Sequence, residues 1–318
     1  MNPPSLPSNQ NPSVSKDTVI WGRRIPAWLV KAVVRVVSLL SVAILLYILY
    51  SNWGLLRQYS WNLQVVPFLI SLVIYVGMEL LAALNWGSIV DQISHPIKKS
   101  IHFKAHMVSR IGLHLPGPVL HVPGRIYFYG NAAGKMLVTF ASMFELLLIF
   151  ISGGILAIGF GIQFGTSDAW VGILAIVLVG GIAIHPAFLQ KVLKLLRIPS
   201  QTKIRFWSSV RWMLTCMLVW LAFGTSAFFM IQSIYPLSWE QLPGVIGAWV
   251  VSGLIATAAA FLPSSLGFRE LTFSLLLSSF MPAGVATIAA ILTKFLMLAF
   301  DLAIAGIAYK FIKQKPPE

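Results

Sequence analysis

Residues 258–277 read AAAFLPSSLGFRELTFSLLL, an apolar run that is interrupted once and then resumes. The interruption contains Pro263, Ser264, Ser265, Gly267 and the oppositely charged neighbours Arg269 and Glu270. Proline disfavours a continuous helix, and charged side chains are costly inside a membrane. This stretch therefore predicts a break in the backbone and a polar site within a hydrophobic protein.

The composition predicts a membrane protein. Of 318 residues, 58% are hydrophobic and 10% are charged, whereas soluble domains carry about 25% charged residues. The net charge of +14 comes from basic residues between the apolar segments, which favours anionic lipid headgroups as partners and not nucleic acid. The single cysteine, Cys216, excludes a disulfide framework and a cysteine-based metal site.

Apolar segments long enough to cross a bilayer (about 20 residues) recur along the chain. The predicted crossings are Val33–Tyr50, Val65–Trp86, Met136–Phe160, Ala169–Ala187, Trp212–Ile234, Leu242–Leu262 and Val285–Tyr309. With a short helix at Phe268–Phe280 they make an all-α polytopic fold of about eight passes. Basic loops alternate with nearly neutral ones, so we expect both termini in the cytoplasm and the chain in the plasma membrane.

The ends of the chain and one loop have their own predictions. Residues 1–30 are rich in Pro, Ser and Asn and predict a disordered tail; residues 31–311 form the transmembrane domain and 312–318 a second tail. Between the second and third crossings, Ile97, Ile101, Ala105 and Val108 share one helical face opposite basic residues. This pattern predicts an amphipathic helix lying in the membrane interface.

The short helix at Phe268–Phe280 is too short for an ordinary crossing. Its length is about 20 Å, against roughly 30 Å of hydrocarbon. Either the break before it lies below the membrane surface, or the hairpin is re-entrant. Non-helical backbone at that depth is tolerated only where protein buries it or where it lines a wet cavity.

A second break is predicted at residues 110–130, RIGLHLPGPVLHVPGRIYFYG. The residues expected to break the helix are Pro116, Gly117, Pro123 and Gly124, just as Pro263 and Gly267 break the later one. Each break ends in an arginine, Arg125 or Arg269. Broken membrane segments in corresponding places of two halves indicate a substrate site in transporters.

The two breaks carry a family resemblance. The pattern LPSSLGFRE before an apolar hairpin resembles the Gly-x-Arg-Glu signature of the flippase-like membrane domain related to lysylphosphatidylglycerol synthase. The earlier LPGPVLHVPGR, followed by GNAAGKMLVTFASMFELLLIFISG, is similar to that family's upstream block. The resemblance covers roughly Val65–Tyr309 and implies a lipid-handling protein. The synthase members add a large soluble aminoacyl-transfer domain, which is missing before Glu318, so we expect no such enzyme activity here.

The ionisable residues inside apolar segments are the candidate site residues. They are Glu79, Arg125, Glu145, Arg269, Glu270, Lys294 and Asp301. Counting from the turn near Pro282 places Glu270 and Lys294 at the same depth, so we expect them to approach each other.

Two interpretations of the later break stay open. A helix N-terminus with Ser264, Ser265 and Arg269 could bind a lipid phosphate, with Arg125 as the second contact. Alternatively, Gly267 caps the helix, with Glu270 reaching back to it and Arg269 pairing with Glu145.

The remaining signals predict no cofactor, metal or catalytic residue. His102, His106, His114 and His121 cluster in the sequence, but no carboxylate or cysteine lies near them; interfacial histidines on a basic surface are expected instead of a metal site. Motifs for hydrolysis of nucleotides, esters or peptides do not occur.

The leading hypothesis is a flippase-like translocase of an anionic or phosphate-linked lipid, with membrane lipids as partners. A second copy of the chain, or a partner in lipid or glycan assembly, is left open. The alternatives are an accessory membrane subunit of an envelope-lipid or glycan machine and a membrane-embedded transferase acting on a lipid-linked sugar.

Overall fold

The computed structural model describes most of the chain. The described residues are 18–20, 23–25, 39, 43–114, 121–160, 171, 174–175, 178, 180–182, 184–196, 198, 204–259 and 267–312. The α-helices are α2 (Trp53–Gln58), α3 (Val65–Ile93), α4 (Lys99–Ser109), α5 (His121–Tyr129), α6 (Lys135–Phe160), α8 (Pro186–Leu195), α9 (Phe206–Gln232), α10 (Leu242–Ala259), α11 (Phe268–Leu277) and α12 (Ala283–Phe311). Short 3₁₀ helices are η1 (Arg110–His114), η2 (Gly130–Ala132) and η4 (Trp239–Gln241).

Helices dominate the described residues, as the composition predicts. One antiparallel strand pair, β1 (Thr18–Ile20) and β2 (Arg23–Ile25), lies within the predicted disordered tail. This strand pair contradicts the prediction of disorder for these residues. It contains the β-branched residues Thr18, Val19, Ile20 and Ile25, which favour extended backbone.

Four described helices are long and apolar enough to cross a membrane: α3, α6, α9 and α12. They correspond to the second, third, fifth and last predicted crossings. The first and fourth lie partly outside the described residues, and so does the end of the sixth, so the count of eight passes stays a prediction.

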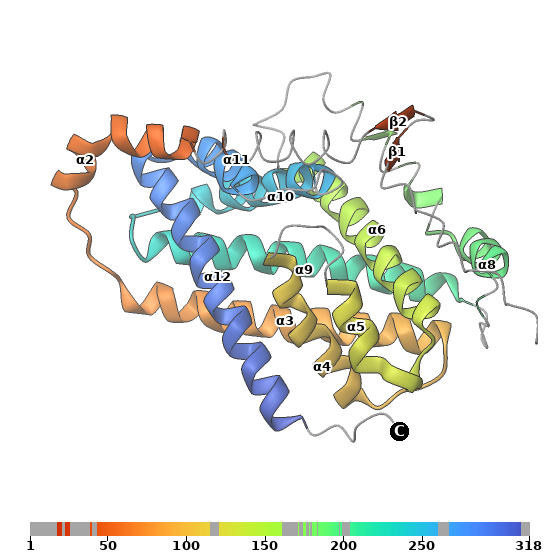
Figure 1. The fold of residues 1–318 in the computed structure, drawn as a ribbon. Coiled ribbons are helices and arrows are strands. Elements are labelled where there is room, and N and C mark those ends of the chain that lie inside the picture. The colour runs from red at the N-terminus through yellow and green to blue at the C-terminus, as the bar shows by residue number, and fades with distance from the viewer. Residues whose placement is uncertain are drawn as a thin grey trace, which may run out of the picture.

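The helices α3 and α9 form the longest contact in the fold, and α12 crosses them obliquely (Figure 1). Small residues let α3 and α9 approach closely. The Ser71 hydroxyl donates to the Ser226 carbonyl (2.8 Å), and the Ser226 hydroxyl donates to the Ser71 carbonyl (3.0 Å). Such hydrogen bonds are the usual interhelical contacts of polar side chains in membranes.

Two apolar cores lie at opposite ends of the α3–α9 pair. One contains Tyr75 and Met78 of α3 and packs against α10, α11 and α12. The other contains Trp86 and Ile93 of α3 and packs against α6 and the first half of α9. Glu79 falls on α3 between these two groups, so buried polar residues occupy the middle of the bundle.

The helix α4 turns three polar side chains into the bundle, whereas the interfacial amphipathic helix predicted here would turn its polar face outward. It packs against α3, α5 and α12 (Figure 1), and its polar side chains His102, Lys104 and His106 are all buried. The prediction was wrong because these side chains find polar partners inside the bundle. The Lys104 ammonium, for example, donates to the Ile312 carbonyl at 3.0 Å.

The first predicted break is shorter than the sequence suggests. Pro123 and Gly124 lie inside α5 and do not interrupt it, which corrects their prediction as break residues. Pro123 is in the first helical turn, where no intrahelical partner is lost. At Gly124 a Cβ would lie 3.2 Å from the Ser109 Cβ, so the glycine serves close packing of α5 on α4. Pro116 and Gly117 lie outside the described residues.

The second break ends as the capping interpretation predicts. Gly267 is the N-cap of α11 with φ of 83°, a left-handed conformation that favours glycine. Its backbone N–H donates to the Glu270 carboxylate at 3.1 Å. Pro263, Ser264 and Ser265 lie outside the described residues, so the phosphate cradle proposed for the two serines stays a prediction.

Candidate functional site

A cavity of about 280 Å³ lies in the middle of the bundle, and a second of about 100 Å³ adjoins it. Both are lined by Arg110, Leu113, Phe223, Arg269, Glu270 and Lys294. We call the two together the polar cavity. Arg125 and Glu145 line its larger part, and Asp301 lines its smaller part.

The Arg125 guanidinium is fixed on one side of the polar cavity. It lies 2.5 Å from the Glu145 carboxylate and 3.8 Å from the centre of the Trp86 ring. Arg125 Nη1 also donates to the Ser142 hydroxyl at 3.4 Å, and Nη2 lies 3.3 Å from His106 Nδ1. Arg125 is 3% exposed, so this pairing satisfies a charge that burial would otherwise destabilise strongly.

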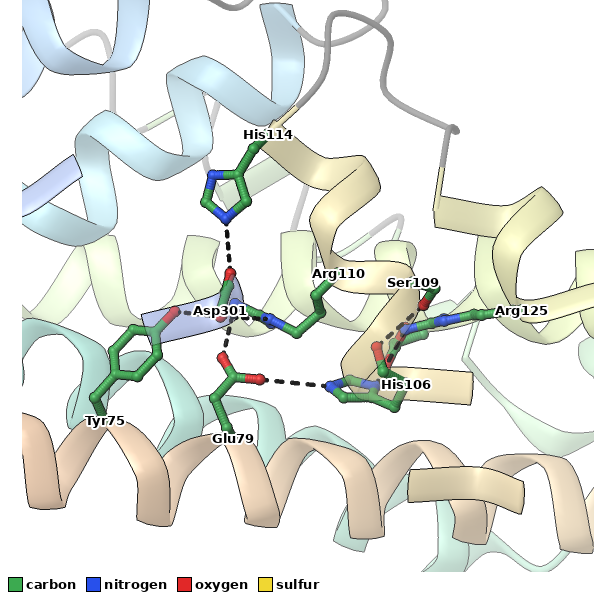
Figure 2. A network of polar contacts seen from close by, with 9 residues as sticks. Tyr75, Glu79, His106, Ser109, Arg110, His114, Arg125 and Asp301 are labelled. Carbon is green, nitrogen blue, oxygen red and sulfur yellow. Dashed lines mark hydrogen bonds and ion pairs between the residues drawn. The ribbon is translucent and has the colours of Figure 1, made fainter. Parts of the chain in front are cut away.

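A second cluster joins α3, η1 and α12 through Arg110 (Figure 2). Arg110 Nη2 lies 2.7 Å from Glu79 Oε1, and Arg110 Nε lies 3.5 Å from Asp301 Oδ1. The Tyr75 hydroxyl donates to Asp301 Oδ1 at 2.7 Å, and His114 Nε2 lies 2.7 Å from Asp301 Oδ2. The Arg110 guanidinium therefore forms ion pairs with two buried carboxylates, those of Glu79 and Asp301.

The third group surrounds the start of α11. Lys294 Nζ lies 3.7 Å from Glu270 Oε1, which confirms the predicted approach of these two residues. Arg269 lies over the Trp249 ring at 4.0 Å. Among the described residues no carboxylate lies within ion-pair distance of Arg269, so its predicted pairing with Glu145 does not form; Glu145 pairs with Arg125 instead.

The histidines are not on an interfacial surface, which corrects that prediction. His102 contacts the Tyr129 hydroxyl (2.6 Å) and the Asp91 carboxylate (2.9 Å). His106 and His121 are buried on α4 and α5, outside the four long apolar helices. Burial and the nearby Arg125 guanidinium lower the pKa of both, that of His121 to about 3, so both imidazoles are neutral at physiological pH.

The structure brings together most of the residues selected from the sequence. Arg125, Glu145, Arg269, Glu270, Lys294 and Asp301 line the polar cavity, and Glu79 contacts it through Arg110. Arg110 was not among the site residues predicted from the sequence. Arg110 begins the first broken segment, and a charged residue beside a predicted backbone break was the feature of the sequence that could have identified it.

Two tryptophans were missed for a different reason. The Arg125 guanidinium lies over the Trp86 ring and the Arg269 guanidinium over the Trp249 ring. Nothing in the sequence distinguishes these two tryptophans from the others in apolar segments. Among the described residues, no group of three or more His, Cys, Asp and Glu side chains is close enough to hold a metal ion.

Comparison with known proteins adds no identification. No protein-family model matches the chain, and a search of curated proteins finds no significant match.

Proposed function

We propose that this chain binds the phosphate-bearing or otherwise anionic headgroup of a membrane lipid in the polar cavity and carries it across the membrane. The observation that supports the proposal best is the position of Arg269. It lines the cavity without a carboxylate in ion-pair distance among the described residues, and a partly buried cation in that situation is stabilised by a bound anion.

The surroundings of Arg269 favour an anion as well. Arg110, Arg125 and Lys294 line the same cavity, and guanidinium groups bind phosphate oxygens through two parallel hydrogen bonds. The N-terminus of α11, a helix of 10 residues, begins beside Arg269 and adds the positive end of its dipole.

The volume of the cavity limits what enters it. About 280 Å³ is near the lower end of ligand pockets, which start at about 300 Å³. This space holds a headgroup and not the acyl chains, which remain in the bilayer. In the proposed translocation, the headgroup occupies this polar site while the acyl chains stay in lipid.

The membrane topology belongs to the same proposal. It comprises about eight passes, including the short α11, and a location in the plasma membrane, with both termini in the cytoplasm as the alternation of basic loops predicts. The flippase-like resemblance agrees with a lipid substrate.

Native mass spectrometry of the purified protein with its bound lipids tests the proposal. Arg269→Ala should fold, because it breaks no ion pair among the described residues, and should lose the bound lipid. Arg211→Ala, at an exposed position on α9, is the matched control and should keep it. Equal retention by wild type, Arg269→Ala and Arg211→Ala would contradict headgroup binding and favour an accessory subunit whose buried charges only hold the helices together.

A further inference from the structure

The charges of the polar cavity balance when it is empty. The charged side chains that line it or pair with its lining are the cations Arg110, Arg125, Arg269 and Lys294 and the carboxylates Glu79, Glu145, Glu270 and Asp301. These eight described residues sum to zero while the adjacent histidines are neutral. A bound anion therefore leaves an uncompensated negative charge in a region of low dielectric, which is unfavourable.

A proton can restore the balance, and the four carboxylates differ in how easily they accept it. Glu145 has its own guanidinium at 2.5 Å, and Glu270 has Lys294 and a backbone N–H. Glu79 and Asp301 share one arginine. Two carboxylates that share one cation favour protonation of one of them, because like charges at short range oppose full ionisation.

Glu79 is the better acceptor of the two. Both oxygens of Asp301 already receive hydrogen bonds, from Tyr75 and His114. Glu79 is 1% exposed, and its Oε2 has no hydrogen-bond partner among the described residues; His106 Nε2 lies 3.9 Å from it (Figure 2). A proton on Oε2 costs no hydrogen bond that the empty site makes.

We propose that the pair Glu79 and Asp301, joined by Arg110, is a proton-binding site, and that one proton binds there with each anion that enters the polar cavity. The coupling to an anion rests on the proposed function; the proton site itself does not. The proton adds to a carboxylate oxygen to give a neutral carboxyl group, and no other bond changes. Arg110 and Asp301 both line the smaller part of the cavity.

Arg110 links the two binding events. It contacts both carboxylates and also lines both parts of the polar cavity. When Glu79 is neutral, the guanidinium is less compensated and attracts the anion more strongly. Proton and anion therefore favour each other's binding, and this reciprocity is required by linkage.

Other charged or titratable groups face this site from every element around it. From α3 and α4 they are Tyr75 and His106, from η1 His114, and from α5 and α6 His121, Arg125 and Glu145. From α9 comes Cys216, and from α11 and α12 come Arg269, Glu270 and Lys294. Of these groups, His114 contacts Asp301 directly, at 2.7 Å.

Infrared difference spectroscopy of the purified protein tests the proton site without any lipid. Between about pH 8 and about pH 5, the range in which a perturbed carboxyl or a histidine changes charge, wild type should gain the carbonyl band of a buried carboxyl group. Glu79→Gln should lose that band, and Asp301→Asn should alter it. The second variant keeps the test possible if Glu79→Gln fails to fold. A wild-type spectrum without such a band, or a band unchanged in both variants, would overturn the proton site.

Lipid retention at the same two pH values tests the coupling. With one proton per anion, affinity for the co-purified anionic lipid should rise by up to about tenfold for each unit that the pH falls. Glu79→Gln should bind lipid equally at both values, whereas Glu240→Gln, at an exposed position, should behave like wild type. Lipid binding that is independent of pH in wild type refutes the coupling. A wild type that binds no lipid at either pH refutes the proposed function and the coupling with it, while the infrared result still decides the proton site.

Discussion

Replacing Glu145 with leucine should destabilise the protein by leaving the Arg125 guanidinium buried without a carboxylate. In the folded state, Arg125 Nη1 lies 2.5 Å from Glu145 Oε2, and both residues are less than a tenth exposed: 3% for Arg125 and 7% for Glu145. The pair joins α5 to α6, so its loss affects the first broken segment directly.

The expected loss is about 3 kcal/mol, at the lower end of the range of about 3–5 kcal/mol for breaking a buried pair. Three contacts keep it from being larger. The Ser142 hydroxyl and His106 Nδ1 lie 3.4 and 3.3 Å from the guanidinium, and the Trp86 ring lies 3.8 Å from it. These groups continue to stabilise the charge after the carboxylate is gone.

The double variant Glu145→Leu with Arg125→Met separates charge from packing. Because it removes both charges and keeps the volumes similar, it should recover to within about 2 kcal/mol of wild type, the remainder being the lost stacking on Trp86. Unfolding in detergent, followed by tryptophan fluorescence, measures all three proteins. If Glu145→Leu is as stable as wild type, or if the double variant is no more stable than the single one, the buried ion pair is not what holds α5 to α6.

Alanine substitutions at three glycines give further tests. Gly224→Ala should cost about 1–3 kcal/mol, because a Cβ there would lie 2.9 Å from the Ile246 Cα and force α9 and α10 apart; Gly77→Ala, where a Cβ meets no atom within 4 Å, should unfold at the wild-type temperature or above it. Gly267→Ala should cost about 1–2 kcal/mol because its φ of 83° is left-handed, and an unfolding temperature equal to that of wild type would mean that α11 starts elsewhere.

Local rules in the sequence predicted the start of α11 and its contact with α12 well. The distance of Glu270 and Lys294 from a common turn predicted their contact, and the order Gly267-x-x-Glu270 predicted the cap. Both depend on helix geometry within one hairpin, α11 and α12, and need no knowledge of other helices. The long apolar helices were predictable for the same reason.

The first broken segment was harder to predict because tertiary contacts decide it. Arg110 and the histidines were interpreted as part of a basic surface, since a helix with a polar face has the same sequence pattern whether that face meets water or buried carboxylates. Their partners come from distant helices: Glu79 from α3 and Asp301 from α12. Only the packing of α4 against both helices reveals that the charges face inward.

The two arginines predicted as phosphate ligands differ in a way that the sequence could not indicate. Each guanidinium lies with its face on a tryptophan, Arg125 on Trp86 at 3.8 Å and Arg269 on Trp249 at 4.0 Å, and this stacking leaves the N–H groups in the guanidinium plane for hydrogen bonds. In Arg125 those donors contact Glu145, so an anion must compete with a carboxylate that is already bound. In Arg269 no carboxylate within the described residues occupies them. Under the proposed function, Arg269 is therefore the first ligand of an incoming anion, and Arg125 becomes a second ligand only when Glu145 moves away or is neutralised.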